Sequence, residues 1–237
     1  MKAPLSTLRV VAAQPAVTDL VSTVRSHARI IDVAEADLVV FPELSLTGYR
    51  FDASPISPVR DTDLLEPITT ACARTGAVAV AGAPAEYLRS TVIAMLRIDG
   101  SGVSIAHIKS TLGGAEPEHF APGPGPSVID VKRWRIGLAI CKETGDMSYT
   151  RSLAAEGVDV YACGVVHHDH ELGEQERRAR LIAAACDAPV VMASFAGSTG
   201  EGYSSTAGRS TIWSAAGSPL ASASDAPGDY AIGIVSR

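Results

Sequence analysis

Three apolar segments of the sequence each end at a residue that can take part in acid–base or nucleophilic chemistry. "LVVFPE" ends at Glu43, "SIAHIK" ends at Lys109, and "RIGLAIC" ends at Cys141. Functional groups of α/β proteins gather where strands end and loops begin. If the three segments are neighbouring strands, a carboxylate, an ammonium and a thiol meet at one rim.

These three groups together would form an activated nucleophile. A free thiol, with a pKa of about 8.5, is mostly protonated at neutral pH, and it becomes a strong nucleophile when a base takes its proton or a cation stabilises the thiolate. We expect Glu43 to be the base and Lys109 to stabilise the thiolate of Cys141 and the later oxyanion. The peptide N–H of Lys142 is the expected second oxyanion donor. Taken singly, a cysteine at a strand end is more often a core residue.

The elements that must position these residues are predicted from hydrophobic patterning. Short apolar runs bounded by turn residues predict buried strands, and residues 18–36, 61–74, 146–156 and 173–187 predict helices. Residues 91–98 and 103–109 predict a hairpin, residues 113–126 an irregular loop, and the last forty residues three short strands. We therefore expect an α/β fold, with one domain over residues 1–237 and helices covering the sheet faces.

Composition excludes several classes of protein. Of the 237 residues, 46% are hydrophobic and 19% are charged, the net charge is −6, and no basic block indicates nucleic-acid binding. The sequence has no apolar run that reaches the ~20 residues of a membrane span, and residues 1–17 lack a convincing signal-peptide core. We expect an intracellular, cytoplasmic protein. Its four cysteines form no CxxC pair and are predicted to be free thiols.

The words around the three residues resemble the motifs of the nitrilase, or carbon–nitrogen hydrolase, superfamily. "FPELSLTGY" (41–49) resembles its glutamate motif, "HIKSTLGGAEPEHFAPG" (107–123) its lysine motif, and "RIGLAICKETGDMSYTRSLAAEGVDV" (135–160) its cysteine motif. "AGRSTIWSAAGSPLA" (207–221) is similar to its late hairpin. The order of the motifs matches, and the resemblance covers nearly the whole chain.

The resemblance implies a four-layer α-β-β-α sandwich that assembles as a homodimer or higher homo-oligomer. It implies cofactor-free hydrolysis of a non-peptide C–N bond through a thioester, with Glu43 as general base, Lys109 as stabiliser of the tetrahedral intermediate and Cys141 as nucleophile. Glu116 stands where many members carry a second glutamate that positions substrate or assists proton transfer. The chain departs from the family at Lys142, where many members have an aromatic residue or asparagine, and at Thr144–Gly145, which lack the arginine pair of carbamoyl-amino-acid hydrolases.

The remaining polar and aromatic residues suggest a substrate pocket. We expect Tyr49, Phe120, Glu143, His167 and His168 to line it, although Tyr49 and Phe120 are equally explained as core residues. The cluster "VVHHDHE" (165–171) fits no standard zinc spacing, so no metal is expected, and solvated histidines explain it as well as substrate contact does.

A small-amide amidase is the function that these features favour. The alternatives are a nitrilase or an acyltransferase that uses the same three residues, a non-catalytic small-molecule-binding protein, and a papain-like enzyme with a histidine that orients the thiol.

Overall fold

Two six-stranded sheets form the centre of the computed structural model, which describes residues 6–237. The first sheet has the order β14 (Asp229–Ser236), β1 (Thr7–Gln14), β2 (Leu38–Val40), β3 (Val78–Tyr87), β4 (Ser90–Asp99) and β5 (Gly102–Ile108). The second has the order β13 (Pro219–Ser222), β12 (Thr211–Trp213), β9 (Val190–Ser194), β8 (Val160–Val165), β7 (Trp134–Ile140) and β6 (Ser127–Val131). Two short strands, β10 (Ala196–Gly197) and β11 (Thr206–Ala207), pair separately.

The strands at the middle of each sheet run parallel. β1, β2 and β3 are parallel neighbours in the first sheet, and β7, β8 and β9 are parallel neighbours in the second. Strands buried on both faces read as continuous apolar runs, which explains why the sequence predicts them well. The carboxyl ends of parallel neighbours lie at one edge of a sheet, so residues that follow β2 and β7 are free to approach each other there.

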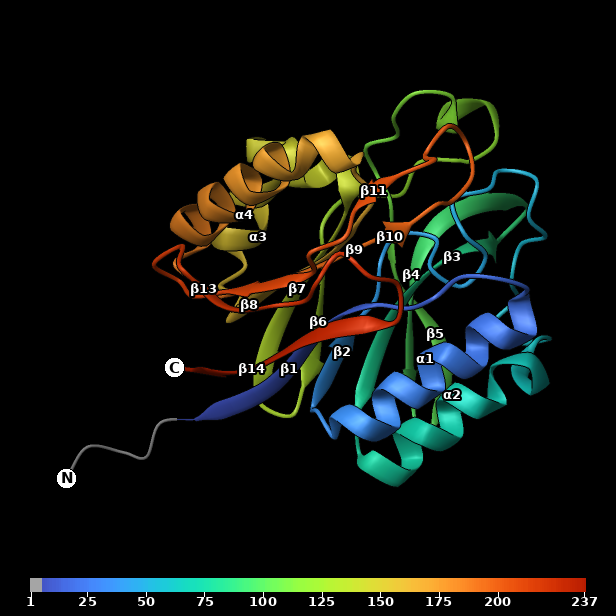
Figure 1. Cartoon of the computed structure of the whole chain (residues 1–237), viewed down its shortest axis with the longest axis horizontal. Coiled ribbons are helices and arrows are strands. Elements are labelled where there is room, and N and C mark those ends of the chain that lie inside the picture. The colour runs from blue at the N-terminus through green and yellow to red at the C-terminus, as the bar shows by residue number, and fades with distance from the viewer. Residues whose placement is uncertain (1–5) are drawn as a thin grey trace.

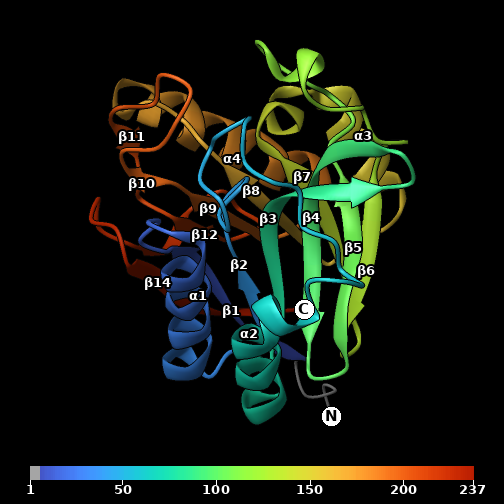
Figure 2. The same cartoon turned by 90° about the vertical axis from the view of Figure 1, so that its right-hand side faces the viewer.

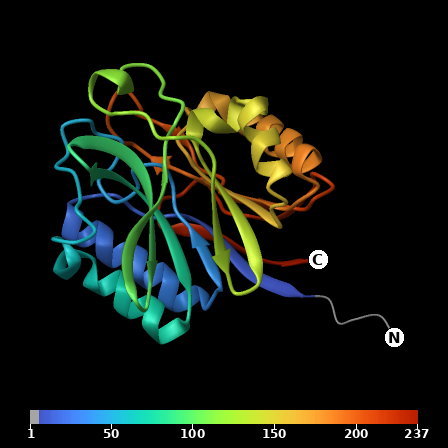
Figure 3. The same cartoon turned by 180° about the vertical axis from the view of Figure 1, so that it is seen from behind.

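Helices cover the outer face of each sheet. α1 (Leu20–Ala34) and α2 (Thr62–Thr75) lie against the first sheet, and α3 (Met147–Ala155) and α4 (Leu172–Cys186) against the second (Figures 1 and 2). The Asp19 side chain caps α1 by accepting a hydrogen bond from the Ser22 N–H. The two sheets lie between the two helical layers (Figure 3), so the expected α-β-β-α sandwich is confirmed.

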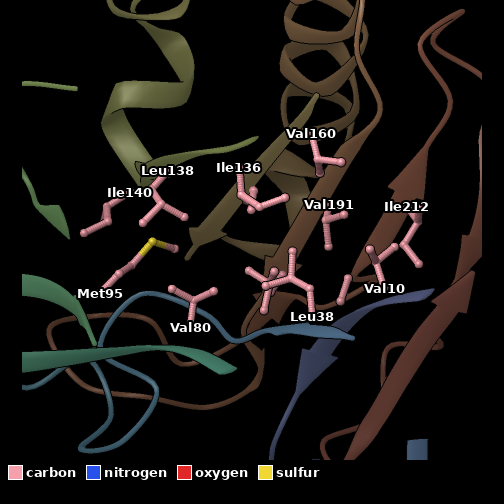
Figure 4. Packing of buried hydrophobic residues seen from close by; sticks show 14 of the residues in the cluster. Val10, Leu38, Val80, Met95, Ile136, Leu138, Ile140, Val160, Val191 and Ile212 are labelled. Atoms are coloured by element: carbon pink, nitrogen blue, oxygen red, sulfur yellow. The ribbon is translucent and has the colours of Figure 1, made fainter. Parts of the chain in front are cut away.

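The two sheets pack face to face through a shared apolar core. Val10, Leu38 and Val80 of the first sheet lie opposite Ile136 and Val191 of the second (Figure 4). Residues alternate between this core and the helix-covered faces: on β7, Ile136 and Leu138 face the other sheet, while Ala139 packs beneath the helices. This packing fixes the distance between the strand ends that carry the polar residues.

The structure adds details that the sequence did not predict. β6 was not expected, the last forty residues contain four strands rather than three, and the loop at 113–126 holds a 3₁₀ turn at Glu116–Glu118. The one-domain expectation over residues 1–237 stays a prediction, since residues 1–5, with part of the N-terminal segment, lie outside the described residues. Over residues 6–237, no helix is long and apolar enough to cross a membrane.

Candidate active site

Glu43, Lys109 and Cys141 come from two different sheets and meet at one site. Glu43 lies just beyond β2, Lys109 directly follows β5, and Cys141 directly follows β7. The Lys109 Nζ donates a hydrogen bond of 2.6 Å to Glu43 Oε1. The Cys141 thiol lies near enough to Glu43 to favour its ionised form.

Two glycines allow the Glu43 segment to lie between the sheets. A Cβ on Gly82 of β3 would lie 2.3 Å from the Pro42 carbonyl oxygen, and a Cβ on Gly164 of β8 would lie 2.8 Å from the Glu43 nitrogen. Real Cβ atoms essentially never come this close to other atoms. Only glycine therefore permits both sheets to contact the Glu43 backbone, which places the carboxylate at the sheet-to-sheet seam.

Lys109 is buried but fully surrounded by acceptors. Its Nζ bonds Glu43 and also both carboxylate oxygens of Glu116, at 2.6 and 2.8 Å. Glu116 is held in turn by the Tyr49 hydroxyl at 2.5 Å and the Gly113 N–H at 2.7 Å. Burial lowers the pKa of Lys109, but Glu43, Cys141 and Glu116 outweigh it and raise the pKa above its usual value. Lys109 is therefore a cation.

Glu43 has the properties of a base that works near neutral pH. Burial raises its pKa to about 7, against the opposing effect of Lys109. One oxygen, Oε1, is occupied by Lys109, while Oε2 is buried and has no hydrogen-bond partner among the described residues. This free oxygen can accept a proton from the thiol and later from water.

Cys141 is held in a strained backbone conformation at the start of a 3₁₀ turn, Cys141–Gly145. Its φ is 41°, in the left-handed region that residues other than glycine seldom adopt. The Thr144 hydroxyl stabilises the turn by donating to the Cys141 carbonyl at 2.6 Å. Burial, together with the charge of Glu43, raises the pKa of the thiol to about 12. At neutral pH the resting thiol is protonated and needs a base to become nucleophilic.

A cavity of about 350 Å³ opens beside the thiol. Of the residues expected to act at this site, Tyr49, Lys109, Glu116, Cys141, Lys142 and His167 line it. Lys142 lies along its rim, with its ammonium donating to the Leu112 carbonyl at 2.9 Å. The first N–H groups of a helical turn have no partner within the turn, so the Lys142 N–H is free to act as an oxyanion donor.

Three residues that were expected in the pocket lie behind its lining. Phe120 packs edge-on against Phe51, and His168 stacks on Tyr203 with ring centroids 4.3 Å apart. Glu143 is completely buried and bonded within the protein. The lining also contains five residues that the sequence did not indicate: Phe51, Glu171, Arg178, Glu201 and Tyr203. No local signal marks them, since they come from loops and from α4 and become neighbours only after folding.

The histidines do not form a thiol–imidazole pair. Burial lowers the pKa of His167 to about 4, so its ring is neutral at physiological pH. Its Nδ1 contacts the Gln175 Oε1 at 3.2 Å, and because the Gln175 Nε2 donates to the Gly208 carbonyl, Nδ1 carries the hydrogen. The Cys141 thiol instead donates to the Val166 carbonyl at 3.5 Å. Among the described residues, no group of three or more His, Cys, Asp or Glu side chains could hold a metal ion.

Comparison with known proteins agrees with this geometry. The chain resembles the solved structure of Nit3 from Saccharomyces cerevisiae, a member of branch 10 of the nitrilase superfamily, with a TM-score of 0.86, 18% identity, and 98% of this chain and 91% of that chain covered. A carbon–nitrogen hydrolase from Helicobacter pylori G27 gives a TM-score of 0.80, 19% identity and coverages of 96% and 88%. An amidase from Nesterenkonia sp. gives 0.77, 20%, 97% and 90%.

The structural likenesses show the fold, and the sequence itself shows the family. No curated protein sequence matches the chain significantly. The family model described as carbon–nitrogen hydrolase, however, matches residues 7–236, nearly the whole chain. The chain therefore belongs to the carbon–nitrogen hydrolase family.

Proposed function

We propose that this protein is an amidase that hydrolyses small linear amides through a thioester on Cys141. The observation that carries the proposal is the buried Lys109 ammonium, which bonds Glu43 and Glu116 beside a thiol in a strained turn. A binding protein needs no buried base beside a nucleophile, and burying these charges is costly unless they are used together.

The first step forms the acyl-enzyme. Glu43 Oε2 takes the thiol proton of Cys141, and the sulfur attacks the amide carbonyl carbon, so that a C–S bond forms and the carbonyl oxygen becomes an oxyanion. The Lys109 ammonium and the Lys142 N–H stabilise that oxyanion. The C–N bond then breaks, and ammonia or an amine leaves with the proton that Glu43 had accepted.

The second step releases the acid. Glu43, ionised again, takes a proton from a water molecule, and the resulting hydroxide attacks the thioester carbon. The C–S bond breaks, the sulfur recovers a proton from Glu43, and a carboxylic acid leaves. A base with a pKa of about 7 suits both directions of proton transfer. Glu116, bonded to Lys109 and Tyr49, holds the ammonium in place throughout.

The walls of the cavity favour a small polar substrate. Lys142, Arg178, Glu171 and Glu201 bring charges of both signs to the lining. A polar acyl group suits this lining better than a long apolar chain does. The amidase from Nesterenkonia sp. AN1 supports an amide in particular, because the acetamide moiety of fluoroacetamide adds covalently at the active-site cysteine of that protein. Nitrile hydrolysis and acyl transfer use the same first attack and remain the alternatives to be tested. A cytoplasmic location and a homodimer belong to the same proposal.

The test is ammonia release from a panel of small amides, carbamoyl compounds and nitriles, together with intact-mass detection of the trapped thioester. Cys141→Ala and Lys109→Ala should abolish release, and the adduct should map to Cys141. Cys186→Ala is the matched control, because this half-buried thiol lies at the end of α4 and should be dispensable. His167→Ala, His168→Ala and His170→Ala should each still form the adduct. Undiminished ammonia release by Cys141→Ala would refute the proposal.

A further inference from the structure

A buried carboxylate lies between the segment that carries Lys109 and the turn that carries Cys141. Glu143 belongs to the 3₁₀ turn after β7, and its side chain is completely excluded from solvent. It does not line the cavity. All of its contacts go instead to residues that flank the catalytic lysine and the nucleophile in the chain, which sets it apart from the exposed acids of the surface.

Four donors fill the hydrogen-bonding capacity of Glu143. Its Oε1 accepts from the Ser110 N–H and the Ser110 hydroxyl, both at 2.7 Å. Its Oε2 accepts from the Ile140 N–H at 2.7 Å and from His107 Nε2 at 2.8 Å. An ionised carboxylate has about four lone-pair sites, and each of them is used here. Although burial raises the pKa of Glu143, the bonds from His107 and Ser110 lower it below its usual value.

The four donors come from both sheets. His107 and Ser110 belong to β5 and the residues just after it, on either side of Lys109, while Ile140 is the last residue of β7 and directly precedes Cys141. β5 is an edge strand of the first sheet and β7 belongs to the second. We propose that Glu143 is a positioning residue whose carboxylate joins these two strand ends and thereby sets the separation of the Lys109 ammonium and the Cys141 thiol.

A second contact supports the same role for His107. The Tyr149 hydroxyl donates to the Leu138 carbonyl at 2.7 Å and lies 3.2 Å from His107 Nε2. The Ser127 hydroxyl lies 3.1 Å from His107 Nδ1. Groups from β7, α3 and β6 therefore hold the imidazole that bonds Glu143, so the connection between the strand ends is rigid on both sides.

The substitution Glu143→Gln tests this inference sharply, because an amide has the same shape but replaces one oxygen by an NH₂ group. If the NH₂ takes the place of Oε2, it faces the Ile140 N–H, and if it takes the place of Oε1, it faces the Ser110 N–H. The Ser110 hydroxyl and the His107 ring can rearrange to accept, but a backbone N–H cannot. Either orientation pushes one strand end away.

The inference rests on the proposed amidase function, and we expect kcat to fall about 100-fold in Glu143→Gln, the order of magnitude for a displacement near 1 Å, while KM changes little. Glu118→Gln, an exposed acid beyond Lys109, is the control and should match the wild type. If Glu143→Gln does not fold, Ser110→Ala removes one of the four donors and should lower kcat about tenfold. A folded Glu143→Gln or Ser110→Ala variant with wild-type kcat would overturn the inference.

A second readout does not depend on the substrate. The rate at which iodoacetamide modifies Cys141, followed by peptide mapping, should rise with pH through about 7 in the wild type as Glu43 ionises. In Glu143→Gln the midpoint should move toward the ordinary thiol value of about 8.5. An unchanged midpoint in a folded variant refutes the positioning role. Full ammonia release by Cys141→Ala, in contrast, refutes the amidase function and leaves this result standing.

Discussion

The clearest test of how the fold builds the site is the substitution Gly164→Ala. Gly164 lies on β8 of the second sheet, and the segment Phe41–Glu43 of the first sheet passes directly against it. An alanine Cβ would lie 2.6 Å from the Phe41 carbonyl oxygen and 2.8 Å from the Glu43 nitrogen. Ordinary contacts begin at 3.4 Å, so the two sheets must separate locally by about 0.8 Å.

This separation has an expected cost in stability and in activity. Overpacking of a close-packed core typically destabilises by about 1–3 kcal/mol. Because the atoms that move are the backbone of Glu43, the base shifts relative to the thiol, and a misplacement near 1 Å lowers the rate about 100-fold. We expect Gly164→Ala to unfold at lower urea concentration and to lose between one and two orders of magnitude in kcat.

The assay combines urea unfolding with ammonia release, and Gly173→Ala is the matched control. Gly173 lies in the first turn of α4, and a Cβ there would meet no atom within 4 Å. Its replacement should raise stability by up to about 1 kcal/mol, because alanine has the higher helix propensity. The reasoning is refuted if Gly164→Ala keeps the wild-type urea midpoint and kcat.

Further predictions concern the buried charges. Lys109→Met leaves Glu43 and Glu116 without their cation and should cost about 3–5 kcal/mol in urea unfolding at pH 8, less in acid where the carboxyls protonate. Tyr49→Phe removes one bond to Glu116, worth about 1.5–3 kcal/mol, and should lower kcat at constant cavity shape; an unchanged kcat would contradict this role. The value of kcat/KM should fall below pH 7, because Glu43 then protonates. Since burial raises the pKa of Glu43 from 4.5 to about 7, its contribution to stability is full below pH 4.5 and is lost as the pH rises through 7, which urea midpoints of the wild type and Glu43→Gln should show.

The fold could be predicted because its central strands are buried on both faces. Segments such as Val160–Val165 and Val190–Ser194 are continuous apolar runs, and this pattern needs no tertiary information. β6 escaped prediction because most of Ser127–Val131 is only half-buried, so its sequence alternates weakly and follows a Gly/Pro-rich loop. Helix boundaries agree within about two residues where a capping residue such as Asp19 marks the start.

The site was predictable only where chemistry directly follows a strand. Glu43, Lys109 and Cys141 each end an apolar run, so topology alone brings them together. Glu143 was placed in the pocket because it is near the nucleophile in sequence, but a 3₁₀ turn sends alternate side chains in different directions, and this one points into the protein. Arg178 and Tyr203 reach the cavity from distant segments, and no local pattern announces such neighbours.

The charges at the site also explain why the nucleophile is activated only during attack. Lys109 supplies one buried positive charge against the carboxylates of Glu43 and Glu116, so ionising the thiol as well would add a further uncompensated negative charge. The thiol therefore gives up its proton only to Glu43, whose free oxygen is the unpartnered acceptor beside it. One proton then shuttles between sulfur and carboxylate while the net charge of the site stays constant. The high pKa of Cys141 and the raised pKa of Glu43 are two consequences of this single constraint, and a substitution that changes either charge must shift both.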